Sequence, residues 1–229
     1  MTNRTDPAGK ARPGTILGIE TGSRGLSVAI RKDSIDLARE AAETDHGQAT
    51  MLMPMIERVR QAAGLAYSDL DRIAVALGPG SFTGLRVGLA AALGLSLAAG
   101  VPAIGISSFH AVANGLERPA GTRLIVVLDS RREEPFVAEL TSAAEFLHVP
   151  CVMTVAELDV FVKSAVPAVL CGDAPALERY RASDGIRLHI RSADAPGVAF
   201  LAADSEHRYD LPPRPVYIRP PDVTMPKPA

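Results

Sequence analysis

The clearest candidate for chemistry in this sequence is a glycine-rich stretch, GPGSFTGLRVG, at residues 78–88. It follows an apolar run that predicts a buried strand and leads into a run that predicts a helix. Glycines let backbone N–H groups approach an anion, and a helix N-terminus favours negative charge. The candidate phosphate-binding residues, here and at two strand ends, are Glu20, Thr21, Gly78, Gly80, Ser81, Thr83, Gly84 and Asp129.

Two interpretations of this loop stay open. A tight connection between strand and helix also needs glycine, because the backbones pack closely there. The loop is not a Walker motif, since no lysine follows its last glycine. The five histidines are scattered, without the i, i+4 pair that places two imidazoles on one helical face. No metal site is therefore predicted, and no serine stands in the G-x-S-x-G pattern of a hydrolase.

Composition and charge favour an ordinary globular protein. Hydrophobic residues make up 47% and charged residues 22% of the 229 residues. A formal net charge of −2 gives no overall attraction for nucleic acid, and 4% aromatics argues against a protein that stacks RNA bases. The polar N-terminal residues lack the apolar core of a signal peptide, so the expected location is the cytoplasm, with no membrane contact.

The elements that must position the glycine-rich loop come in two similar halves. Strands are expected at 16–19, 26–30, 34–39, 73–77 and 101–106, with helices at 48–63 and 85–99. The second half predicts strands at 124–128, 136–140 and 168–171, and helices at 156–163, 174–181 and 197–207. This repetition predicts a duplicated βββαβα unit. We expect a disordered leader at 1–14, lobes at 15–108 and 109–220, and a flexible tail at 221–229.

The helix expected at 85–99 is apolar nearly all round, which is typical of a helix covered on all sides. Either the chain itself covers it, between the sheet and the first helix, or a partner does. Methionines in the first helix add adaptable contact surface. The candidate partner or dimer interface is His46, Met51, Leu52, Met55, Ile56, Val59, Gly84, Leu85, Gly88, Ala91, Ala92 and Leu95. Replacing Gly88 with leucine is expected to abolish association by a steric clash.

Seven segments resemble, in order and spacing, the TsaB (YeaZ) family. They are ILGIET at 16–21, His46 with Leu52 and Pro54, AGL at 63–65 followed by DLD at 69–71, the glycine-rich stretch at 78–88, GISS at 105–108, LDSRRE at 128–133 and PVYIRP at 215–220. One residue departs from the pattern, because the family's opening strand usually ends in Asp and this chain has Glu20. That departure makes ATP hydrolysis by this chain still less expected.

The resemblance implies an α/β, two-lobed actin-like or sugar-kinase-like fold, whose chain end can return to the first lobe. It implies a non-catalytic scaffold subunit for forming the threonylcarbamoyl group on the adenosine beside the anticodon of tRNAs that read ANN codons. The helix pair would join the catalytic TsaD subunit, and the complex would help recruit the ATPase TsaE. The chain alone would be a homodimer and would meet tRNA only indirectly. It would need no cofactor, although ATP or ADP could bind at the complex.

Three other functions remain open at this point. A nucleotide-binding phosphotransferase of the actin and sugar-kinase class would use residues 78–84 and Asp129 at the phosphates. A peptidase would need a metal or a nucleophile, and the sequence supplies no recognisable one. A plain homodimer would need no second protein, which a mixing experiment would distinguish from a scaffold.

Overall fold

The computed structural model describes residues 14–178, 180, 185–204 and 207–219. The expected leader, apart from Gly14, and the expected tail lie outside these residues. The first ten elements are β1 (Thr15–Glu20), β2 (Leu26–Lys32), β3 (Ile35–Ala42), α1 (Gln48–Ala62), the 3₁₀ helix η1 (Tyr67–Asp69), β4 (Arg72–Ala76), α2 (Phe82–Ala99), β5 (Ala103–Ile106), α3 (Ser108–Ala113) and β6 (Arg123–Leu128). The remaining ones are β7 (Phe136–Leu140), β8 (Cys151–Val152), α4 (Val155–Ser164), β9 (Ala168–Gly172), α5 (Ala174–Leu177), β10 (Ile186–Ile190) and α6 (Ala195–Ala202).

The strands form two sheets with the same topology. The first sheet has the order β3-β2-β1-β4-β5, and the second has β8-β7-β6-β9-β10. In each, the first three strands are antiparallel neighbours and the last two join in parallel, as in the pairs Gly18↔Ala74 and Ile125↔Leu170. A helix lies between the third and fourth strands of each half, and another between the fourth and fifth. The predicted duplication is confirmed.

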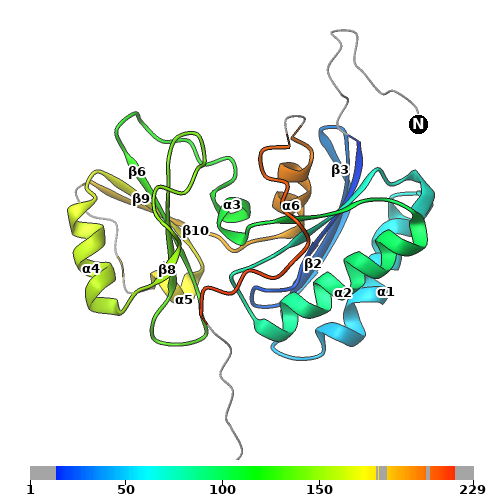
Figure 1. The fold of residues 1–229 in the computed structure, drawn as a ribbon, viewed down its shortest axis with the longest axis horizontal. Coiled ribbons are helices and arrows are strands. Elements are labelled where there is room, and N and C mark those ends of the chain that lie inside the picture. The colour runs from blue at the N-terminus through cyan, green and yellow to red at the C-terminus, as the bar shows by residue number, and fades with distance from the viewer. Residues whose placement is uncertain (1–13, 179, 181–184, 205–206, 220–229) are drawn as a thin grey trace, which may run out of the picture.

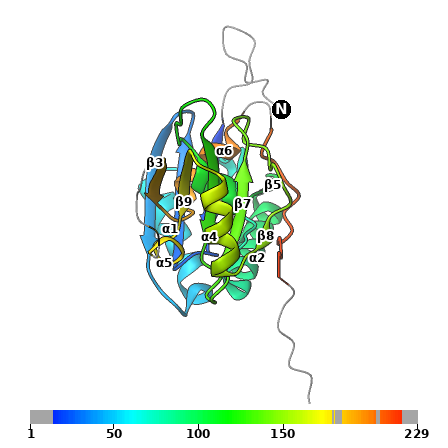
Figure 2. The same cartoon turned by 90° about the vertical axis from the view of Figure 1, so that its left-hand side faces the viewer.

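The sheets and helices are stacked in layers, with α3 and α6 between the two sheets (Figure 1). Helices α1 and α2 pack on the outer face of the first sheet, around residues such as Leu17 and Ile56. The central layer buries inward-facing residues of both sheets, such as Ile16 and Val126, against α3 and α6. Figure 2 shows α4 across the outer face of the second sheet, where Leu158 and Val162 enter a third core. Alternating inward and outward residues along each strand build these separate cores.

Some boundaries differ from the sequence prediction. Helix α2 begins at Phe82 rather than residue 85, because the Ser81 side chain accepts from the Gly84 N–H and caps the helix there. Helix α6 begins two residues early, capped by Asp194, and ends at Ala202 rather than at residue 207. Helix α5 ends at Leu177, short of the predicted 181. Periodicity did not identify α3, β8 or β10, which are short or exposed.

The chain returns to the first sheet near its end. Helix α6 packs against β1, β2 and β4. Beyond it, Leu211 pairs with Gly105 of β5, and the Val216 N–H donates to the Leu77 carbonyl at 2.9 Å. Arg219 then contacts Glu134 of the second half at 2.8 Å. The segment 211–219 is therefore bonded to both halves.

Candidate functional site

The glycine-rich loop is packed against the turn that follows β1. A Cβ on Gly84 would lie 1.9 Å from the Thr21 carbonyl oxygen, and one on Gly80 would lie 2.5 Å from the Gly22 carbonyl oxygen. The buried Thr21 hydroxyl donates to the Gly84 carbonyl at 2.8 Å. Gly78 has a φ of 98°, a conformation that side chains disfavour. These contacts favour the tight-connection interpretation of the loop, because each of these glycines makes room for backbone or supplies an unusual dihedral angle.

The two hydroxyl residues of the loop line a cavity of about 450 Å³ together with Arg131, Arg132 and Arg219. The Ser81 oxygen caps α2, and Thr83 is exposed. Gly88, predicted at an interface, faces inward, where a Cβ would lie 2.3 Å from Thr21 Oγ1. A leucine at this position would therefore also crowd Thr21 within this chain, and its expected effect on association stays a prediction.

Glu20 lies fully inside the protein at the end of β1. Its Oε1 accepts from the N–H groups of Gly22 and Ser23 at 2.6 and 2.9 Å, and its Oε2 accepts from the Ser23 hydroxyl at 2.5 Å. Burial raises the pKa of Glu20 to about 7, against the opposing effect of these hydrogen bonds. The Glu20 carboxyl group therefore holds the turn after β1 in shape, through the two N–H groups and the Ser23 hydroxyl of that turn.

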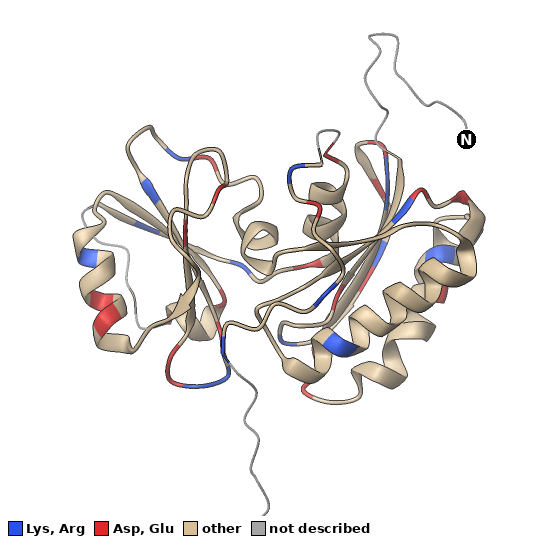
Figure 3. Ribbon diagram, in the orientation of Figure 1, with Lys and Arg blue, Asp and Glu red and all other residues tan. Residues whose placement is uncertain are grey.

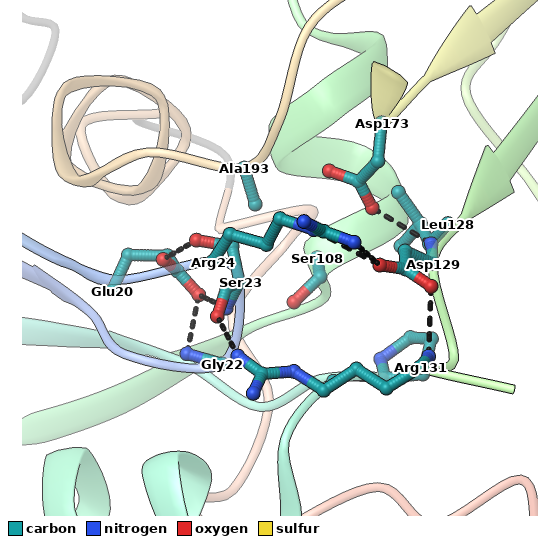
Figure 4. Close-up of a pocket in the computed structure, with 12 residues that line it drawn as sticks. Glu20, Gly22, Ser23, Arg24, Ser108, Leu128, Asp129, Arg131, Asp173 and Ala193 are labelled. Atoms are coloured by element: carbon teal, nitrogen blue, oxygen red, sulfur yellow. Dashed lines mark hydrogen bonds and ion pairs between the residues drawn. The ribbon is translucent and has the colours of Figure 1, made fainter. Parts of the chain in front are cut away.

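Asp129 takes the matching place in the second half, and Asp173 lies beside it. Asp129 follows β6 and Asp173 follows β9, and the Asp129 N–H donates to Asp173 Oδ2 at 2.8 Å. Burial raises the pKa of Asp173 above its usual range. Figure 4 shows both aspartates facing Glu20 across a small cavity, with Arg24 and Arg131 between them. Parallel strands β6 and β9 place their carboxyl ends at one edge of the second sheet, which explains why the two aspartates meet. Glu20 comes from the first sheet and reaches them because the two halves face each other.

The cavity between these residues has a volume of about 20 Å³, enough for one water molecule and too small for a phosphate group. The Ser108 hydroxyl lines it, buried and without a hydrogen-bond partner among the residues that the structure describes. No cluster of three metal-ligating side chains occurs among the residues that the structure describes. The structure thus brings Glu20, Gly80 and Asp129 together as predicted. It also adds residues that sequence reasoning missed, namely Arg24, Ser108, Arg131 and Asp173. Of these, Asp173 was detectable as the acid that follows a buried strand.

The predicted interface residues are mostly buried within this chain. Leu52, Met55, Ile56, Val59, Gly84, Leu85, Gly88, Ala92 and Leu95 all belong to its own interior. Met51 and Ala91 are partly exposed, and His46 is exposed beside Thr44, whose Oγ1 accepts from the His46 N–H at 3.2 Å. These nine residues offer little surface to a partner in this conformation, because they lie inside the chain, between α1, α2, the first sheet and the turn after β1.

The surface that the helix pair does present is apolar and lies on α2. Leu97 is 87% exposed and Leu93 46% exposed, with Ala90 and Ala98 on the same side. Figure 3 shows α2 almost free of charged residues along its length. The start of the helix is covered differently, because Arg86 lies over Phe82 at 3.8 Å and donates to the Tyr217 hydroxyl at 3.1 Å. By length and composition alone, α2 would also qualify as a membrane span.

Comparison with known proteins gives consistent matches. The model of the tRNA N6-adenosine threonylcarbamoyltransferase (TsaD) family matches residues 40–169. The chain is 36% identical over 126 residues to the tRNA threonylcarbamoyladenosine biosynthesis protein TsaB of Escherichia coli, covering 54% of each chain. It is 32% identical over 129 residues to TsaB of Haemophilus influenzae, covering 55% of this chain and 53% of that protein. The chain therefore spans about half the length of these relatives.

Solved structures share the fold. YeaZ from Pseudomonas aeruginosa superposes with a TM-score of 0.71 at 23% identity, covering 89% of this chain and 99% of that one. The activator of 2-hydroxyisocaproyl-CoA dehydratase from Clostridium difficile, solved with bound ADPNP, gives a TM-score of 0.50 at 14% identity over 84% of this chain and 96% of that one. Such likenesses establish the actin-like, sugar-kinase-like architecture that the duplicated sheets already indicate.

Proposed function

The chain belongs to the TsaB (YeaZ) family of tRNA threonylcarbamoyladenosine biosynthesis proteins, and we propose that it is a non-catalytic scaffold subunit for a TsaD-type catalytic partner. In this proposal the partner carries out the transfer to tRNA, and the chain holds it in a competent state and helps recruit the ATPase TsaE. The chain works in the cytoplasm, meets tRNA only through the complex, and forms a homodimer when no partner is present.

The observation that carries this proposal is the uncovered apolar side of α2. Exposure of leucine side chains to water is unfavourable in free energy. Exposed leucines on a helix next to a well-packed core therefore mark contact sites for other proteins. Leu93 and Leu97 lie one turn apart on this side. The apolar side of α2 can pack against a corresponding helix pair of a protein with similar architecture. The match to the TsaD family model makes a TsaD-type protein a natural partner. A second copy of this chain offers the same surface.

The geometry of the cleft supports a subunit that does not itself catalyse a reaction. Glu20 accepts hydrogen bonds from backbone N–H groups of its own turn, and Asp129 accepts from the Arg131 N–H and from Arg24 of the opposite lobe. The cavity beside them is smaller than a phosphate group needs. We therefore propose that this subunit requires no cofactor, and that any ATP or ADP in the complex binds where the partner contributes residues.

The test is tRNA threonylcarbamoylation by TsaD, TsaE and the adenylate-forming enzyme, with and without this chain, together with size-exclusion chromatography of the mixture. Product formation that depends on the chain, with co-elution of the chain and TsaD, is the expected result. Equal product formation without the chain would contradict the proposal.

The interface is tested by replacing both Leu93 and Leu97 with serine. Each leucine removed from a contact costs about 2 kcal/mol, so affinity for TsaD should fall at least 100-fold while the fold is kept. Val160→Ser is the matched control, because Val160 is 70% exposed on α4 in the other lobe. Unchanged affinity of the folded double variant, or an equal loss in the control, would show that α2 is not the contact.

A further inference from the structure

Two arginines cross between the lobes in opposite directions. Arg24, in the turn after β1, donates through Nε and Nη2 to Asp129 Oδ2 of the second lobe, both at 3.2 Å. Arg131, in the turn after β6, donates through Nη2 to the Ser23 carbonyl of the first lobe at 3.1 Å. Its Nη1 lies 3.6 Å from Asp45 Oδ1, also in the first lobe. Figure 4 shows the two side chains lying on either side of Ser108.

The receiving group of each arginine is held in place by its own lobe. Asp129 accepts the Arg131 N–H at 2.8 Å, and its own N–H is bound by Asp173. Ser23 is fixed on the other side by two hydrogen bonds to Glu20. Groups that are already ordered lose little conformational entropy when an arginine binds them. The crossed contacts therefore join two preformed surfaces.

The backbone of Arg131 gives independent support. Its φ is 60°, in the left-handed region where a residue with a side chain is disfavoured and glycine is not. Such a conformation persists when surrounding contacts over-determine it. The guanidinium contacts of Arg131 to Ser23 and Asp45 are among the contacts that hold this residue in place.

The cleft between the lobes is also balanced in charge by its own residues. Glu20, Asp129 and Asp173 line the cavity together with Arg24 and Arg131. Burial raises the pKa of Glu20 to about 7, so part of its negative charge is lost near neutral pH. The two guanidinium groups compensate the remainder. The interior needs neither a metal ion nor an anion to be neutral, and its free space suffices for one water molecule at Ser108.

We propose that Arg24 and Arg131 form a reciprocal latch that holds the two lobes closed over a cleft filled by the protein's own side chains. Closing the cleft fixes the position of α1 and α2 relative to the second lobe. The latch acts together with segment 211–219, which also spans both lobes through Val216 and Arg219. Removing the arginines should therefore loosen the cleft without separating the lobes.

Hydrogen exchange with mass spectrometry tests this proposal. For each substitution, the measured quantity is the backbone exchange rate of a peptide in the opposite lobe. Arg131→Ala should speed exchange of the first-lobe peptide at 20–26, and Arg24→Ala should speed exchange of the second-lobe peptide at 127–132. Each contact is solvent-exposed, so about 5-fold faster exchange is expected. Arg58→Ala is the matched control, because Arg58 pairs at 2.6 Å with Glu40 at similar exposure but within one lobe.

A second measurement needs no variant. Salt screens exposed ion pairs, so exchange of both cleft peptides in the unaltered protein should quicken between low and high ionic strength. This salt dependence should vanish in Arg24→Ala combined with Arg131→Ala. The latch is refuted if neither single variant alters the opposite lobe more than Arg58→Ala does, or if cleft exchange in the unaltered protein is independent of salt.

Discussion

Replacing Gly84 with alanine tests why the glycine-rich loop contains glycine. The added Cβ would lie 1.9 Å from the Thr21 carbonyl oxygen and 3.0 Å from its carbonyl carbon. Both atoms are backbone of a buried turn and cannot rotate away. To accept alanine, the start of α2 must move from the turn, and the bond from the Thr21 hydroxyl to the Gly84 carbonyl at 2.8 Å must stretch or break.

The magnitude follows from these contacts. Overpacking of a filled interior costs about 1–3 kcal/mol, and the lost hydrogen bond costs about 1 kcal/mol. Alanine regains about 1 kcal/mol because it forms helix better than glycine does. The free energy of unfolding should therefore fall by about 2 kcal/mol. In a chain of this size, that lowers the melting temperature by about 4–8 °C.

The matched control is Gly94→Ala in the same helix. Gly94 is exposed, and apart from its chain neighbours and the backbone of its own helix, no atom of the described residues lies within 4 Å of the position that its added Cβ would take. Only the helix preference changes there, so this variant should gain about 1 kcal/mol and melt about 2–4 °C higher. Thermal unfolding followed by circular dichroism measures both. If Gly84→Ala proves as stable as Gly94→Ala, close packing does not explain the glycine, and anion binding by the loop must be reconsidered.

Two further predictions concern the acids of the cleft. Because the pKa of buried Glu20 is raised to about 7, the folded protein binds an extra proton between about pH 5 and 7, and stability should fall as pH rises through this window. Urea unfolding at pH 5 and pH 8 should show a loss of roughly 3 kcal/mol that Glu20→Gln abolishes; an identical loss in that variant would contradict the assignment. Asp129→Asn should leave tRNA modification by the reconstituted complex within about 10-fold of the unaltered rate, whereas a loss of several orders of magnitude with assembly intact would reveal a catalytic role.

Local patterns in the sequence were enough to predict the duplicated architecture. Alternating and continuous apolar runs, such as residues 73–77 and 124–128, mark strands because burial of one or both faces imposes that pattern. The two halves repeat the same order of elements, and the structure confirms it. Helix ends were predicted less well, since capping by Ser81 and Asp194 depends on single side chains.

The interface prediction shows where sequence information ends. An all-apolar helix such as α2 carries no periodic signal that distinguishes its inward side from its outward side. The prediction selected Leu85 and Leu95, which are buried, and omitted Leu93 and Leu97, which are exposed. Only the placement of the sheet and α1 decides which side of the helix remains uncovered.

Local composition and ordered motifs were sufficient to establish the elements of this protein, their repetition and its family. The role of the glycines and the closure of the cleft depend instead on how the chain folds in three dimensions. Gly84 meets Thr21 across 63 positions, and Arg24 meets Asp129 across 105. Contacts over such separations depend on how sheets and lobes are placed against one another, and no local pattern of residues encodes that placement.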